Sequence, residues 1–150
     1  MEIDQIKELS NKLATEKGFW DDHDNMIKKM KGLPKQFNEQ DIDRIKLAFY
    51  CEKISLISSE LGEAIESMRL GRFYNSGEDG IKILFDLVDK PFQFQGTYST
   101  HFKDTFEDEI ADSFIRLFDL CHKMDIDIEK FIMLKLEFNK NRYDNHGKKF

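Results

Sequence analysis

The stretch from 41 to 70 constrains the fold more than any other feature, because it contains no proline and repeats apolar side chains at helical spacing. The stripe is formed by Leu47, Tyr50, Ile54, Ile57, Leu61, Ala64, Ile65 and Met68. A stripe of this kind must be buried against other elements, and Gly71 is a suitable residue to end the helix. The sequence therefore predicts one long amphipathic helix.

Other stretches have the same helical period, and residues that break helices are rare, with two prolines and eight glycines in 150 residues. Further helices are predicted over 2–16, over 80–89, from about 103 to 123, and from Asp127, a suitable N-cap, to about Arg142. The chain is long enough for one domain with its own core. We therefore predict a single all-α domain over 1–150, in which four main helices and some short ones form a bundle.

Three segments depart from this pattern. Residues 23–39 are polar and broken by Gly32 and Pro34, which predicts a loop with room for a short helix. Residues 92–102 alternate aromatic and polar side chains, which predicts a short hairpin or a lid-like loop. Residues 143–150 form a basic tail. Fourteen phenylalanines against one tryptophan also predict a core built largely on phenylalanine.

Composition narrows the classes of function. The net charge of -6 argues against a general nucleic-acid binder but not against a small phosphorylated ligand, whose charge a metal can neutralise. No apolar segment approaches the roughly 18 residues of a membrane span, and the N-terminus does not read as a signal peptide. Cys51 and Cys121 lack metal-site or disulfide spacing. We therefore expect both cysteines to be buried free thiols in a reducing cytoplasm, with neither nucleic acid nor membrane as a partner.

Two short acidic motifs carry the chemistry. Glu60 and Glu63 lie in Ser-Glu-Leu-Gly-Glu-Ala (59–64), and Glu109 and Asp112 lie in Asp-Glu-Ile-Ala-Asp (108–112). Each pair is spaced i, i+3 on a predicted helix, so two facing helices would bring four carboxylates together. Unit charges ~4 Å apart repel by about 4 kcal/mol at an effective dielectric of 20, so the cluster needs a cation or bound protons. Oxygen ligands favour magnesium, manganese or calcium, which points to phosphate chemistry.

A solvated acidic surface is the competing interpretation of these motifs. The chain has 29 acidic residues, so pairs at this spacing also arise by chance. On a helical wheel Glu60 lies near the edge of its apolar stripe, whereas Glu109 and Asp112 lie nearly opposite the Phe114–Phe118 stripe. The wide apolar surface of 103–123 weakens this objection, because a central helix packs on several sides and a polar site can lie between layers.

A basic face on the last predicted helix adds to the phosphate hypothesis. Lys135, Asn139 and Arg142 are spaced i, i+4 and i+7, so they share one face. A lysine supplies a point charge for phosphate, an arginine a bidentate fork, and an asparagine an adaptable amide. The alternative is a solvated basic face near a helix C-terminus, where cations also interact favourably with the helix dipole.

The run Leu-Ile-Ser-Ser-Glu-Leu-Gly-Glu-Ala-Ile-Glu-Ser-Met-Arg-Leu-Gly (56–71) resembles the metal-binding helix of the MazG-like family of all-α nucleoside triphosphate pyrophosphatases. The family pattern is EExxE followed by ExxD on another helix, and the matching residues here are Glu60, Glu63, Glu109 and Asp112. The closing stretches 135–142 and 146–150, and Gly-Phe-Trp-Asp-Asp (18–22), are also similar. The likeness follows the order of the motifs along most of the chain.

Two features depart from the family pattern. Ser59 stands where EExxE has its first glutamate, so this chain has no carboxylate at that position. The spacer between the two motifs is long and contains an apparent insertion at about 71–102, a loop that would shape or cover the substrate pocket.

The resemblance implies magnesium-dependent hydrolysis of a nucleoside triphosphate to the monophosphate and pyrophosphate, with manganese as a possible substitute. Glu60, Glu63, Glu109 and Asp112 would hold the metal, and Glu63 would orient or deprotonate the attacking water. Lys135 and Arg142 would bind phosphates, and Asn139 phosphate or sugar. Trp20 and Phe19 are candidates for stacking on the base, with a structural plug between loop and helices as the alternative.

Family members commonly work as dimers or dimers of dimers, and a long helix at 41–70 with a wide apolar surface at 103–123 exceeds what one small bundle needs. We therefore expect a homodimer at least. Two other functions compete. A ferritin-like oxygen-activating bundle would require Glu-x-x-His motifs that this sequence lacks. A non-catalytic helical module that dimerises or binds a nucleotide remains open because of Ser59 and the long spacer.

Overall fold

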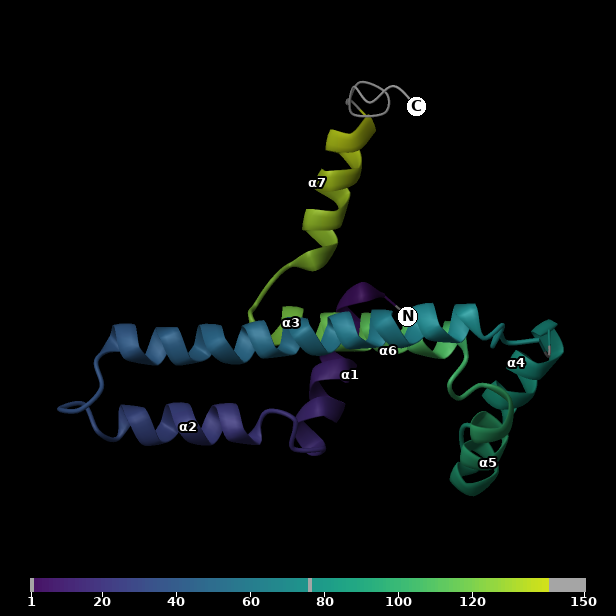
Figure 1. Cartoon of the computed structure of the whole chain (residues 1–150), viewed down its shortest axis with the longest axis horizontal. Coiled ribbons are helices and arrows are strands. Elements are labelled where there is room, and N and C mark those ends of the chain that lie inside the picture. The colour runs from purple at the N-terminus through teal and green to yellow at the C-terminus, as the bar shows by residue number, and fades with distance from the viewer. Residues whose placement is uncertain (1, 76, 141–150) are drawn as a thin grey trace.

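The computed structural model describes residues 2–75 and 77–140, and within these ranges it contains seven helices and no strand. The predicted all-α class is therefore confirmed for the described part of the chain. Figure 1 shows the helices α1 (Ile3–Glu16), α2 (Asp21–Lys31), α3 (Glu39–Arg69), α4 (Gly77–Asp86), α5 (Pro91–His101), α6 (Phe106–Lys123) and α7 (Ile128–Lys140).

Helix α3 is the long helix that the apolar stripe predicts, and both of its ends have local causes. At its start, the Asn38 side chain accepts a hydrogen bond from the Asp41 N–H, and the Asp41 carboxylate accepts one from the Asn38 N–H, each at 3.0 Å. This reciprocal capping satisfies two backbone donors. At its end, Gly71 has φ +67°, a left-handed conformation that suits glycine.

Helix α6 packs against both α3 and α1, while α2 lies along α3. The colour gradient in Figure 1 shows that α3 and α6 run in opposite directions. Thr105 caps α6, because its hydroxyl accepts a hydrogen bond from the Asp108 N–H at 3.3 Å. This antiparallel pair sets the acidic motif at the end of α3 opposite the one at the start of α6.

The structure corrects two predicted loops. The segment 23–39, predicted as a loop with room for a short helix, contains most of the 11-residue helix α2. The first turn of α2 is acidic and its last turn basic, so its charges complement the helix dipole. The segment predicted as a hairpin or lid is helix α5, with Pro91 in its first turn, where the missing N–H costs nothing. Charge placement and a proline start favour helix in both segments despite weak or alternating apolar patterns.

The apparent insertion at 71–102 forms a helical excursion that leaves the α3–α6 pair and returns to it. Its two ends meet where the Phe106 N–H donates to the Arg72 carbonyl at 2.9 Å. The Tyr74 N–H likewise donates to the Glu107 carboxylate at 2.9 Å. Helices α4 and α5 contact each other within this excursion. The insertion therefore leaves the facing of α3 and α6 intact.

The core of the single chain is small. Its buried apolar side chains are Trp20, Ile27, Met30, Ala64, Leu84, Leu120 and Cys121. No described phenylalanine belongs to this group, so the predicted phenylalanine core is wrong for the single chain. The expectation of two buried free thiols is confirmed for Cys121 and wrong for Cys51, which is exposed. Many large apolar side chains consequently remain on the surface.

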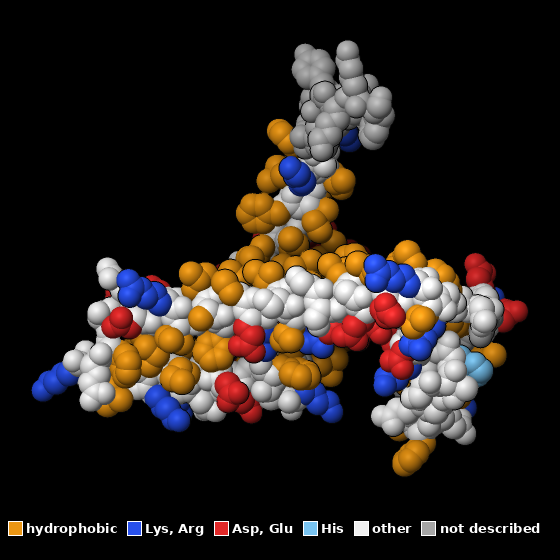
Figure 2. All heavy atoms as spheres, in the orientation of Figure 1, with side chains coloured by type: hydrophobic (Ala, Val, Ile, Leu, Met, Phe, Trp, Pro, Cys, Tyr) orange, Lys and Arg blue, Asp and Glu red, His pale blue; other side chains and the backbone are white. Residues whose placement is uncertain are grey.

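Helix α7 extends away from the other helices (Figure 1), and its side chains from 130 to 140 are all exposed. The carboxylate of Asp127 accepts a hydrogen bond from the Lys130 N–H at 3.2 Å, in agreement with its expected N-cap role. Figure 2 shows apolar side chains on several sides of α7. The last helix therefore does not complete a bundle within one chain. Among the described helices, none has the length and apolar character to cross a membrane.

Candidate metal centre

Three carboxylates from two helices converge between α3 and α6. One oxygen from each of Glu60, Glu63 and Glu109 lies within 4.8 Å of the other two. The i, i+3 spacing places Glu60 and Glu63 on neighbouring turns of α3, and the antiparallel packing of α6 brings Glu109 across to them. Oxygens this close are within reach of a single divalent cation of the kind that binds carboxylates.

Asp112, the fourth predicted ligand, lies beside this group rather than within it. Its side chain is exposed and is outside the set of oxygens within 4.8 Å. Its charge nevertheless raises the pKa of both Glu60 and Glu109. The pKa of Asp112 is itself raised, mainly by desolvation and then by the Asp108 carboxylate. Asp112 is therefore placed at the edge of the centre.

Glu109 is a buried residue that lies among several other carboxylates. Its side chain is 6% exposed. No hydrogen bond or ion pair joins its carboxylate to any other described residue. Desolvation raises its pKa, and the carboxylates of Glu63, Asp108, Glu60 and Asp112 raise it further. A bound cation would offset the repulsion between Glu109 and these neighbouring carboxylates.

Arg116 supplies the positive charge at one side of the cluster and was not among the predicted site residues. Its guanidinium forms an ion pair of 2.8 Å with Glu60. Desolvation raises the pKa of Glu60, and Arg116 acts in the opposite direction. Arg116 lies one turn after Asp112 on α6, at i+4, and this spacing is the sequence signal that could have identified it.

A second polar group supports α6 behind the cluster. One oxygen of the Asp108 carboxylate accepts a hydrogen bond from the Tyr98 hydroxyl, and the other accepts one from the Asp104 N–H at 2.9 Å. Burial raises the pKa of the Tyr98 hydroxyl well above its usual range, and Asp108 adds to this effect. Asp104 and Asp108 also lie near Glu109, within 4.8 Å by their oxygens. Helix α5 from the insertion thus anchors the start of α6.

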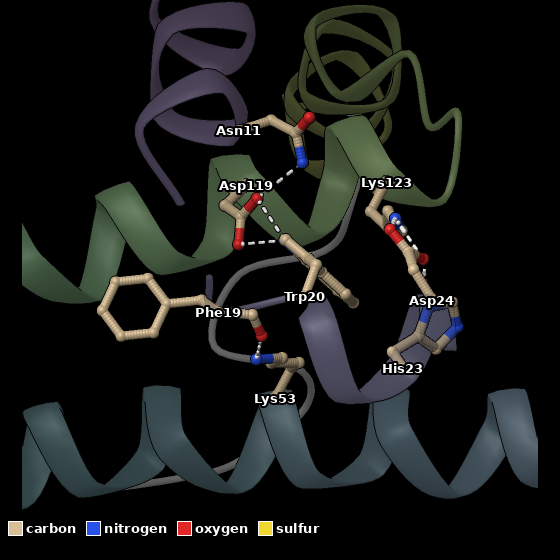
Figure 3. A network of polar contacts seen from close by, with 8 residues as sticks. All are labelled: Asn11, Phe19, Trp20, His23, Asp24, Lys53, Asp119 and Lys123. Atoms are coloured by element: carbon tan, nitrogen blue, oxygen red, sulfur yellow. Dashed lines mark hydrogen bonds and ion pairs between the residues drawn. The ribbon is translucent and has the colours of Figure 1, made fainter. Parts of the chain in front are cut away.

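Figure 3 shows that Trp20 and Phe19 point in different directions from the turn before α2. Trp20 is 1% exposed, and its indole N–H donates to both oxygens of Asp119, at 2.9 and 3.0 Å. This places the Trp20 ring in the core, as in the structural alternative weighed for it. Phe19 is 59% exposed and keeps a free face for a ligand.

The predicted basic residues are not brought to the acidic cluster within one chain. Lys135 and Asn139 lie on α7, which extends away from α3 and α6 (Figure 1). The Lys135 ammonium lies 4.8 Å from the centre of the Phe138 ring. Arg142 is outside the described residues. The phosphate contacts assigned to Lys135 and Asn139 would therefore require another copy of the chain, and the contact assigned to Arg142 stays a prediction.

Comparisons with known proteins supply no family for this chain: no protein-family model, no curated protein and no solved structure matches it. The resemblance to the MazG-like family therefore stays a prediction from the motifs themselves.

Proposed function

We propose that this protein is a nucleoside triphosphate pyrophosphohydrolase that depends on magnesium or manganese and converts a (d)NTP and water to the (d)NMP and pyrophosphate. Glu60, Glu63, Glu109 and Asp112 would hold the metal, as the MazG-like motifs imply. The observation that carries the proposal is the convergence of one carboxylate oxygen from each of Glu60, Glu63 and Glu109 within 4.8 Å of the other two, at residues of which Glu60 and Glu109 are buried. Carboxylate oxygens arranged in this way suit a divalent cation such as magnesium or manganese.

The residues around the cluster suit the chemistry of an anhydride. Glu60, Glu63 and Glu109 would hold a divalent cation, which would supply positive charge to stabilise the leaving pyrophosphate. Glu63 is exposed at the edge of the cluster, so its carboxylate is accessible to water and remains our candidate for orienting or deprotonating the nucleophile. Arg116, held by Glu60, would offer its remaining N–H donors to phosphate oxygens.

We further propose that the active form is a homodimer or a dimer of dimers. Helix α7 has 13 residues, a length at which an isolated helix is marginal in water. Its side chains Phe131, Met133 and Leu134 are 61%, 63% and 66% exposed. A second copy of the chain would cover them, and could also bring Lys135 and Asn139 to a partner's cluster.

Pyrophosphate release tests the proposed reaction. Ordinary and modified NTPs and dNTPs are supplied with magnesium or with EDTA, and phosphate is measured before and after inorganic pyrophosphatase is added. The proposal expects signal only after that addition and only with magnesium. Glu109→Gln should abolish it, whereas Glu66→Gln, at an exposed position on α3 outside the cluster, should keep it. Turnover by Glu109→Gln at the wild-type rate would contradict the assignment of Glu109 to the metal site.

A non-catalytic dimeric module that binds a nucleotide is the second candidate function. The exposed apolar surface of α7 favours it, because an interaction surface of this kind requires no chemistry. The same panel separates the two functions, since a binding module would retain nucleotide without releasing pyrophosphate.

A further inference from the structure

A pocket adjoins the acidic cluster and continues along α6 away from it. Its volume is about 510 Å³, within the usual range for small-ligand sites. Asp112 and Arg116 line it near the cluster, and Asp119 lines it further along α6. Apolar walls come from α1, α3, α6 and the turn after α1, through Leu13, Ala14, Phe19, Leu56 and Ile115. The pocket thus joins a charged end to an apolar interior.

The positions on α6 set the distance between the two ends of this pocket. Asp112, Arg116 and Asp119 are spaced i, i+4 and i+7, so they follow one face of the helix. At a rise of 1.5 Å per residue, Asp112 and Asp119 are about 10 Å apart along the axis. A ligand with its phosphates at the cluster would therefore carry its nucleoside into the part of the pocket near Asp119.

Cations on the pocket wall suit an anionic ligand. Lys17 and Lys53 line the pocket together with Arg116. The Lys53 ammonium donates to the Phe19 carbonyl at 2.6 Å and lies 4.7 Å from the centre of the Trp20 ring. These contacts hold Lys53 beside the turn that carries Phe19, whose exposed ring offers a face for a planar base.

Asp119 presents a buried acceptor to this pocket. Its side chain is 8% exposed, and its described partners are the neutral donors Trp20 and Asn11. The Asn11 amide donates to Oδ1 at 2.8 Å, while Oδ2 accepts only the shared Trp20 indole N–H among the described contacts. A carboxylate offers about four acceptor positions and no donor when ionised, so Oδ2 keeps capacity for one further N–H.

We infer that the pocket binds the nucleoside part of the triphosphate and that Asp119 selects bases with an exocyclic amino group. This inference deepens the proposed function and rests on it for the position of the phosphates. Cytosine and adenine can place an amino N–H on Asp119 Oδ2. Uracil and hypoxanthine carry a carbonyl oxygen at that position, which would face a buried acceptor and leave both groups without a donor. Asp119 is thus a specificity-determining residue at the end of the pocket opposite the metal centre.

Nucleoside monophosphates test the pocket without metal or turnover. Trp20 is the only tryptophan of the chain, and its indole N–H binds Asp119, so its fluorescence reports on this end of the pocket. The full-length protein is titrated in EDTA with CMP, UMP, AMP and IMP. We expect CMP to bind at least about tenfold more tightly than UMP, and AMP at least about tenfold more tightly than IMP. UMP and IMP each lack the amino group that would donate a hydrogen bond to the charged Asp119. Equal affinities within both pairs would overturn the role of Asp119.

Two variants locate the effect. Asp119→Asn replaces an acceptor-only group by an amide that can also donate, so the CMP to UMP affinity ratio should fall to about one or invert. Because this change also removes the charged partner of Trp20, Leu56→Phe provides a second test that leaves Asp119 intact. Leu56→Phe fills the pocket and should weaken the binding of every monophosphate. Leu47 is exposed on the same helix and does not line the pocket, so Leu47→Phe should leave binding unchanged. Unchanged binding by Leu56→Phe would overturn the pocket.

The same protein preparation distinguishes this inference from the proposed function. Magnesium-dependent pyrophosphate release without monophosphate binding in EDTA would overturn the nucleoside pocket and leave the hydrolase. Selective monophosphate binding without pyrophosphate release from any triphosphate would support the pocket and overturn the hydrolase.

Discussion

The α3–α6 pair and helix α7 violate the usual rules of burial in opposite ways. Between α3 and α6, the carboxylates of Glu60 and Glu109 are buried, and Glu109 has no described partner. On α7, Phe131 and Leu134 are more than half exposed. Charges seldom remain buried without compensation, and large contiguous apolar surfaces seldom remain in water.

The two regions differ in the kind of partner that would compensate them. A cation would compensate the charges between α3 and α6, because their oxygens converge on a small volume. A cation could do nothing for α7, whose surface requires another apolar surface. Removing a carboxylate should therefore affect metal binding and activity, while removing an apolar side chain from α7 should affect assembly. The following predictions test that division.

The largest expected effect is on activity at Glu109. Glu109→Gln should lower magnesium-dependent turnover by at least about a hundredfold, since metal stabilisation of charge contributes several kcal/mol. In EDTA the same variant should be at least as stable to heat as the wild type, because it removes a buried charge repelled by its neighbours. Steady-state kinetics and thermal unfolding measure the two effects. A large loss of stability of Glu109→Gln in EDTA would contradict the prediction, because it would show that Glu109 stabilises the fold instead of binding a cation.

The next effect is on assembly at α7. Phe131→Glu combined with Leu134→Glu should convert a homodimer to a monomer at micromolar concentration, because charges at the centre of an apolar interface typically cost several kcal/mol. Sedimentation velocity over a hundredfold range of concentration measures this change. Lys130→Glu, a change of charge on the same helix at an exposed polar position, is the control and should retain the dimer. A wild type that remains monomeric throughout would contradict the assignment of α7.

A smaller effect is expected on the stability of the core. Trp20→Phe removes the indole N–H that both Asp119 oxygens share, and should lower the free energy of unfolding by about 2–3 kcal/mol. Leu136→Ala on α7, made in the monomeric double variant, should change it by less than about 0.5 kcal/mol because this side chain is 59% exposed. Urea denaturation measures both. Equal losses would show that α7 packs against its own chain.

The smallest effect is on the pH dependence of stability. The pKa values of Glu60, Glu109 and Asp112 are raised above 4.5, 4.5 and 3.8. The native state therefore binds more protons than the unfolded state just above those values, so in EDTA stability should fall as the pH rises through this window. Added magnesium should stabilise the protein more as the pH rises, because protons no longer compete for the oxygens. Thermal unfolding at several pH values tests the sign, and a magnesium effect that grows as the pH falls would contradict it.

Much of the fold follows from local patterns, and the exceptions have physical causes. The stripe from Leu47 to Met68 correctly predicts α3, because the helical period repeats over many turns and single exceptions do not hide it. The alternation at 92–102 wrongly favours a hairpin, since it outweighed Pro91 as a helix start. The phenylalanine core is wrong for the single chain because composition does not say which apolar side chains face inward. Phe131 and Phe114 illustrate this, as both are exposed.

In the acidic motifs, too, local spacing predicts some features and helix packing decides others. Spacing alone places Glu60 and Glu63 on one face of a helix, but the wheel set Glu109 opposite an apolar stripe and favoured solvent. Packing of α6 against both α1 and α3 buries Glu109 instead. Arg116 and Asp119 share a face with Asp112, yet their partners Glu60 and Trp20 are distant in sequence.

The sequence by itself determined the helical class, the extent of the long helix and the pairing of carboxylates within each motif, because helical periodicity and i, i+3 spacing are local properties. Only the tertiary structure decided that the two motifs face each other, that Arg116 compensates Glu60, that Trp20 is buried against Asp119, and that α7 extends from the body of the single chain. These outcomes depend on which helix faces pack together. That choice is made by the free energy of the whole chain rather than by any one segment.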